Sequence, residues 1–327
     1  MAEIALRAYV KEIDDLVERE QLDEAIAHSR HVLETYPKHL DTYRLLGKAY
    51  LEAKRYGDAA DLFQRVLSAI PDDFVAHIGM SIVREDEGNL DASIWHMERA
   101  FETNPANPAI QQELRRLIGK RDGVEPHKVR LTRGALARMY AHGELYPQAI
   151  AELRSALQEE ADRPDLQVLL ANLYWRTDQK EQAADVAQQI LTKLPFCRDA
   201  NRIAAGYLQG VGRVDEATPS HRRLASLDPY AAFVETAMID PIGVDAGSVH
   251  LEKLEWRPGH PVAAPDLRRP TWTDSLGAGL RAETKQTAAA AAAVPEGPIP
   301  NWLAGDTPSQ AATPAPATPP APAAPPP

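Results

Sequence analysis

The sequence has 327 residues, with 36 basic and 47 acidic side chains and a net charge of −11. Its one cysteine excludes an internal disulfide and a cysteine-rich zinc site. We expect no membrane insertion, because no run of 18 or more apolar residues occurs, and no secretory signal, because the acidic first segment lacks an apolar core. The acidity also argues against nucleic-acid binding. Because neither a secretory signal nor a membrane span is expected, we predict a cytoplasmic protein.

Residues 1–240 are predicted to be all-α, because apolar side chains recur at helical spacing and strand-like alternation is almost absent. Prolines mark a period of 34 residues within this region. Counting back from them gives repeat starts at 6, 40, 74, 164 and 198, and a start at 130 fits the same frame. The prolines that set the period are Pro37, Pro71, Pro105, Pro195 and Pro229.

The second repeat shows the pattern most fully. The residues that carry the pattern are Tyr43, Leu46, Gly47 and Tyr50, then Ala59, Phe63, Val66 and Pro71. This pattern resembles the tetratricopeptide repeat (TPR), and weaker versions recur in the other repeats. The resemblance, to bacterial TPR proteins with a Pro/Ala-rich tail, covers about 70% of the chain. It implies about six helix-turn-helix units stacked as an α-solenoid.

The period breaks once, after an extra helix expected at 108–118. We therefore predict a sub-array one over 1–118, with repeats from 6, 40 and 74. A linker at 119–129 follows, where we expect a bend or hinge. Sub-array two then covers 130–240, with repeats from 130, 164 and 198 and a closing helix at 230–239.

Residues 241–327 hold 17 of the 27 prolines and few branched aliphatic side chains. Such a composition cannot bury enough apolar surface to offset the entropy of ordering, so we predict a disordered Pro/Ala-rich tail. Only residues 248–256 alternate well enough to form a short strand.

Two Pro-x-Trp segments in the tail are predicted docking motifs, because a tryptophan there has no core to fill. The alternative is a chance hydrophobe in a linker. The docking surface is either another protein or the chain's own groove, in cis. The motif residues are Pro270 and Trp272, and Pro300, Trp302 and Leu303.

Nothing in the sequence matches a phosphate-binding loop, a zinc-protease motif or a nucleophile elbow, so we expect no enzyme, no metal and no cofactor. His28 and His31 share a helix face but have no third ligand at suitable spacing. Cys197 has no catalytic signature, and we interpret it as a reduced structural or exposed thiol.

In proteins of the TPR family, certain positions of each first helix line a concave groove. Sub-array one carries a net charge of −8 and residues 119–240 a net charge of −1, so the groove of sub-array two is predicted to be the more basic. Guanidinium groups hold carboxylates and an amide can pair with a peptide backbone. We hypothesise that repeats four to six bind an acidic or carboxylate-bearing extended peptide; the alternative is an ordinary solvated helix face. The groove residues are Arg44, Lys48, Arg138, Asn172, Trp175, Arg176 and Arg202.

The sequence therefore predicts a non-catalytic scaffold or adaptor that binds other proteins or peptides in its groove. The alternative is a dedicated regulatory subunit of an enzyme or of an envelope-assembly complex. The two differ in the number of partners, which the sequence does not give.

Overall fold

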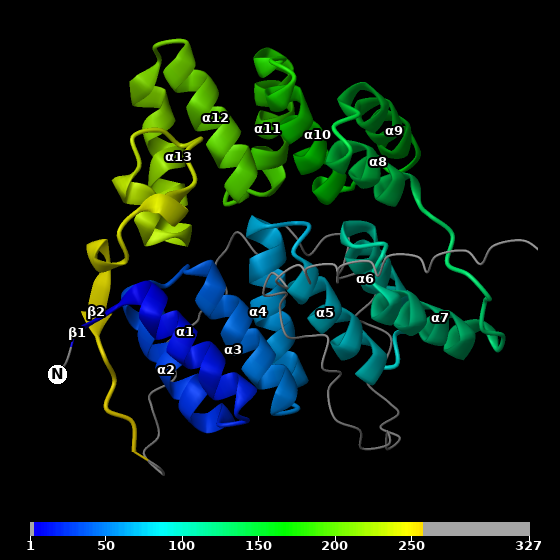
Figure 1. Cartoon of the computed structure of the whole chain (residues 1–327), viewed down its shortest axis with the longest axis horizontal. Helices are drawn as coiled ribbons and strands as arrows, with labels where there is room; N and C mark the ends of the chain where they lie inside the picture. Colours follow the sequence, from blue (N-terminus) through cyan, green and yellow to red (C-terminus); the bar gives the residue numbers. More distant parts are fainter. Residues whose placement is uncertain (1–2, 258–327) are drawn as a thin grey trace, which may run out of the picture.

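The 34-residue period folds into antiparallel helix pairs within residues 3–257, the part of the chain that the computed structural model describes (Figure 1). The all-α solenoid prediction is confirmed. The first sub-array contains α1 (Leu6–Glu18), α2 (Leu22–Thr35), α3 (Leu40–Glu52), α4 (Tyr56–Ala69), α5 (Phe74–Asp86), α6 (Leu90–Thr103) and α7 (Pro108–Asp122). The second contains α8 (Arg133–His142), α9 (Tyr146–Glu159), α10 (Pro164–Arg176), α11 (Lys180–Lys193), α12 (Arg198–Gly210) and α13 (Val214–Leu227).

The turn inside each helix pair has the same backbone conformation in all six repeats. Helices α1, α3, α5, α10 and α12 begin at residues 6, 40, 74, 164 and 198, the starts expected from the prolines. The fifteenth residue of each repeat, with 130 counted as one of the starts, has a positive φ in the left-handed region. This conformation ends the first helix of the pair. These residues are Glu20, Lys54, Gly88, Glu144, Asp178 and Gly212.

Phe63 occupies the closest approach between the second and third repeats. A Cβ atom on Gly47 would lie 2.8 Å from the Phe63 ring, and one on Gly79 would lie 2.2 Å from it. Both distances are shorter than any real contact, so only glycine lets the ring lie between α3 and α5. The core of sub-array one is built around this ring, which is fully buried.

The chain turns back on itself after α7, at the linker where a bend was expected. Helices α8–α13 then lie across one side of α1–α6 (Figure 1). A small apolar cluster joins the two sub-arrays, with Leu40 and Ile70 from the first packing against Leu227 and Phe196 from the second. The two sub-arrays therefore contact each other along their inter-repeat loops instead of continuing as one open superhelix.

No closing helix forms over residues 230–239, contrary to the sequence prediction. A short 3-10 helix, η1 (Pro229–Phe233), is followed by an extended Val234 and then by a turn in which the Ile239 amide donates to the Thr236 carbonyl oxygen. The carbonyl oxygens of Ala237 and Met238 accept hydrogen bonds from the Arg202 guanidinium, so they are not used for helix formation.

Residues 234–257, which we call the strap, connect the end of sub-array two to the first helix. The strap contains η2 (Pro241–Gly243), η3 (Ala246–Ser248) and β2 (His250–Glu252), which pairs antiparallel with β1 (Glu3–Ala5). The strand expected within 248–256 is therefore present.

The predicted tail boundary at 241 is too early, because ordered backbone continues to residue 257. The buried side chains of Val249 and Leu251 pack against the first repeat and order this stretch. The docking motifs at Pro270, Trp272, Pro300, Trp302 and Leu303 lie outside the described residues. Of the helices within 3–257, none has the length and apolar character needed to cross a bilayer.

Candidate functional site: a basic cavity in the second sub-array

The first helices of repeats four to six enclose a cavity of about 460 Å³. Helices α8, α10 and α12 each contribute to its wall because equivalent faces of stacked repeats point to the same side of a solenoid. Its lining is basic, with four arginines against Glu144 and Asp199. The arginines are Arg138, Arg176, Arg198 and Arg202.

The structure brings together four of the seven groove residues predicted from the sequence: Arg138, Asn172, Arg176 and Arg202 all line this cavity. Arg44 and Lys48 lie on α3 and do not line it. Arg44 pairs with Asp73 at 2.6 Å, and Lys48 is buried within 3.7 Å of Asp14.

Trp175 lies beside the cavity, as part of the apolar core of sub-array two. Lys180 contacts its ring face at 5.5 Å. A Cβ atom on Gly206 would lie 3.1 Å from the end of the indole, so Trp175 covers the backbone of α12 at this point.

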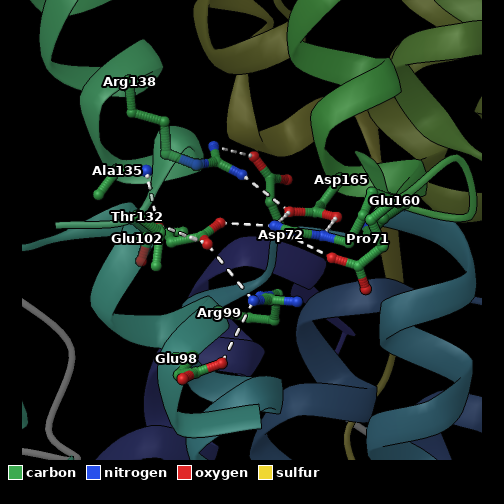
Figure 2. A network of polar contacts seen from close by, with 12 residues as sticks. Pro71, Asp72, Glu98, Arg99, Glu102, Thr132, Ala135, Arg138, Glu160 and Asp165 are labelled. Atoms are coloured by element: carbon green, nitrogen blue, oxygen red, sulfur yellow. Dashed lines mark hydrogen bonds and ion pairs between the residues drawn. The ribbon is translucent and has the colours of Figure 1, made fainter. Parts of the chain in front are cut away.

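Arg138 is held within a buried ionic network between the sub-arrays (Figure 2). Its guanidinium lies 3.1 Å from the Asp72 carboxylate and 3.5 Å from that of Asp165. Burial alone would raise the pKa of Asp165, but hydrogen bonds from Arg163 and the charges of Arg163 and Arg138 lower it to about 2. Arg138 therefore already has two carboxylate partners from its own chain.

Glu102 and Arg163 form the centre of the same network, and the sequence did not single them out. Glu102 accepts a hydrogen bond from Thr132, and Arg163 also binds Asp165. No sequence signal identifies this pair, because glutamate near the end of a second helix is also typical of a solvated face.

Arg202 is also engaged, but with backbone. It donates hydrogen bonds to the carbonyl oxygens of Ala237 and Met238 in the strap, at 3.2 and 3.0 Å. Arg198 pairs with Asp199 at 3.2 Å, and the Asn172 amide donates to the same carboxylate at 3.3 Å.

Arg176 differs from the other three arginines of the cavity. It is exposed, and within residues 3–257 it has neither an ion pair nor a hydrogen bond. A guanidinium in this state can hold a carboxylate bidentately without first giving up an internal partner. Arg176 is therefore the cation of the cavity that is most available to a ligand.

The histidine and cysteine residues considered from the sequence have structural partners. His28 Nδ1 lies 2.6 Å from the Tyr9 hydroxyl, and His31 Nε2 lies 2.7 Å from the Glu252 carbonyl oxygen. Among residues 3–257 no three His, Cys, Asp or Glu side chains are grouped to hold a metal ion. Cys197 is fully buried, and burial raises the pKa of its thiol to about 12, so it is an unreactive core thiol.

A model of the tetratricopeptide repeat family matches residues 16–80 and 144–205. Among solved structures, PilF of Pseudomonas aeruginosa is 13% identical, with 69% of this chain and 92% of that chain covered and a TM-score of 0.29. A tetratricopeptide repeat protein from Parabacteroides merdae is 12% identical, with coverages of 67% and 77% and a TM-score of 0.30. MamA is 15% identical, with coverages of 72% and 97% and a TM-score of 0.28. No curated protein matches the chain.

Proposed function

We propose that the chain, of which two regions match the tetratricopeptide repeat family, is a protein–protein interaction scaffold whose basic cavity binds a carboxylate-bearing extended peptide. The observation that carries the proposal is the exposed Arg176 in a cavity lined by three further arginines. The cavity volume of about 460 Å³ lies within the roughly 300–1,000 Å³ of ligand sites.

The charge distribution supports an acidic partner at this position. Sub-array one has 14 basic and 22 acidic residues, so it repels an acidic peptide, whereas residues 119–240 have 16 and 17. Local fields of this kind steer a charged ligand towards the more basic surface. Asn172 lies beside Arg176 on α10, where its amide can pair with the backbone of an extended peptide.

The experiment compares fluorescein-labelled oligoglutamate and oligoglutamine peptides by anisotropy on the full chain. We expect the glutamate peptide to bind more tightly, and Arg176→Ala to weaken it about tenfold, equivalent to one charge-assisted hydrogen bond. The matched control is Arg222→Ala, which removes an exposed arginine from α13 outside the cavity. Equal affinity for the two peptides, or equal effects of the two substitutions, contradicts the proposal.

The proposal is for a non-catalytic, cytoplasmic adaptor, with a dedicated regulatory subunit as its alternative. An adaptor recovers several different proteins by affinity capture and mass spectrometry. A dedicated subunit recovers one partner at fixed stoichiometry.

A further inference from the structure

The backbone of α12 is directly covered by a side chain of the strap at Gly206. A Cβ atom there would lie 2.7 Å from Met238 Cγ and 3.1 Å from Met238 Sδ. It would also lie 3.1 Å from the indole of Trp175. The missing side chain thus creates a notch, with α12 as its floor and Trp175 beside it, that accommodates the methionine.

The backbone on both sides of this side chain is held separately. Arg202, one helical turn before Gly206 on the same face of α12, donates to the carbonyl oxygens of Ala237 and Met238. Hydrogen bonds to main-chain carbonyls give affinity for a segment of any sequence, whereas a side-chain pocket gives specificity. Arg202 supplies the carbonyl hydrogen bonds and the notch at Gly206 supplies the side-chain pocket, within one turn of α12.

Met238 and the buried Ala237 hold this part of the strap against sub-array two. The neighbouring Ile239 and Ile242 are 50% and 79% exposed, so their side chains are not held. The backbone is extended at Val234 and Asp240, and between them the Ile239 amide donates to the Thr236 carbonyl oxygen at 3.1 Å, so Met238 lies in a tight turn. A second cavity, of about 140 Å³, shares Arg198 and Arg202 with the basic cavity, and its strap lining is Val234, Ala237, Ile239, Asp240 and Pro241.

We propose that Gly206, Trp175 and Arg202 form a peptide-binding subsite for a tight turn that presents a long, unbranched apolar side chain. Residues 234–240 occupy this subsite in cis. The inference rests on the proposed function, since Arg202 lines the same cavity. It adds an apolar anchor residue to the carboxylate that the bound peptide is proposed to carry. A partner segment carrying methionine at this position exchanges with the strap.

The test uses a labelled synthetic peptide with the sequence of residues 232–243, added to the full chain. In the wild type the strap competes, so the apparent affinity of the peptide is the intrinsic affinity multiplied by the fraction of molecules whose subsite is free. Met238→Ala removes the competing side chain, and we expect the peptide to bind this variant at least about tenfold more tightly. A peptide with alanine in place of its methionine is expected to lose this gain.

Two further substitutions are made in the Met238→Ala background. Arg202→Ala removes the carbonyl donors and Gly206→Ala fills the notch, and each is expected to abolish the gain. The control is Ile242→Ala, which alters an exposed strap side chain and is expected to bind the peptide like the wild type. Circular dichroism verifies folding, and Arg202→Ala carries the test if Gly206→Ala does not fold.

Equal affinity of the peptide for wild type and Met238→Ala, or full binding after Arg202→Ala, overturns the subsite. The oligoglutamate probe of Arg176 is measured on the same proteins. If it fails to bind while the methionine peptide binds as expected, the carboxylate site is wrong and the subsite stands. If only the oligoglutamate binds, the subsite is wrong and the carboxylate site stands.

Discussion

Glu102 and Arg163 form an ion pair of 2.5 Å that joins the two sub-arrays across 61 residues of sequence. Their side chains are 1% and 5% exposed, so the pair is removed from water. Gly134 on α8 makes room for it, since a Cβ atom there would lie 2.3 Å from the Glu102 carboxylate. Without Arg163, the buried Glu102 would keep only the longer ion pair with Arg99 at 3.4 Å, and Asp165 only that with Arg138 at 3.5 Å, so both carboxylates would be poorly compensated.

Arg163→Ala is therefore expected to destabilise the folded chain by about 3–5 kcal/mol, the usual cost of breaking a buried pair. Urea denaturation followed by circular dichroism measures the change. The control is Arg213→Ala, which removes an exposed partner of Glu216 and is expected to leave the unfolding midpoint unchanged. Similar midpoints for the two variants would show that the buried network does not hold the sub-arrays together.

Gly79→Ala tests the packing of Phe63. Alanine improves helix propensity by up to about 1 kcal/mol over glycine. At Gly79, however, the added Cβ lies 2.2 Å from the Phe63 ring, and overpacking costs about 1–3 kcal/mol. We expect a net loss of stability in thermal and urea melts.

Two variants serve as controls for this prediction. Gly57→Ala has no atom within 4 Å of the new Cβ and is expected to be neutral or stabilising. Phe63→Leu combined with Gly79→Ala is expected to lose less than the sum of the two single changes, because the smaller side chain makes room. Additive losses would exclude the proposed contact.

The helix pairs were predictable because their information is local. Gly47 belongs to the repeat pattern read from the sequence, and the structure places its backbone directly against Phe63. Arg138 was predicted as a ligand-binding residue, yet it binds Asp72, 66 residues away. Repeat periodicity specifies how neighbouring repeats pack, but not which distant charges meet once the chain turns back on itself. The first part of the strap escaped prediction for the same reason: Arg202 recognises the carbonyl groups of Ala237 and Met238, and every residue carries such a group.

The buried histidines His77 and His96 predict a pH dependence of stability. His77 Nε2 lies 2.9 Å from the Pro71 carbonyl and must donate to it, so His77 Nδ1 accepts from His96 Nδ1 at 3.0 Å. Burial lowers the pKa of His77 and, with the neighbouring positive charges, lowers that of His96 well below 6.5. Both imidazoles are therefore neutral in the folded protein.

A lowered folded-state pKa means that the unfolded chain binds protons that the folded chain does not. The stability of the protein is thus expected to be highest above pH 6.5, and to fall as the pH drops below it towards the folded-state values. Urea midpoints across this range measure the slope. His96→Asn keeps a donor for His77 and is expected to flatten the slope. An unchanged slope in that variant would place the pH dependence elsewhere.

Arg7 fastens the strap to the first helix. Its guanidinium donates to the carbonyl oxygens of Pro241 and Val244, both at 2.6 Å, and lies 3.8 Å from the centre of the Tyr230 ring. No other side chain has this planar fork with several donors, so lysine is a poor substitute. We expect Arg7→Ala to free residues 234–249 while the helix pairs stay folded.

Hydrogen exchange read by mass spectrometry tests this expectation, since local opening raises exchange only where the backbone is released. Strap peptides of Arg7→Ala are expected to exchange at least about tenfold faster than in the wild type, and peptides from α10 and α12 at the same rate. Lys11→Ala, on an exposed face of α1, is the control. Faster exchange throughout α1–α6 instead would mean that Arg7 stabilises the first repeat itself, whereas unchanged strap exchange would mean that β1–β2 pairing and the Arg202 contacts hold the strap without Arg7.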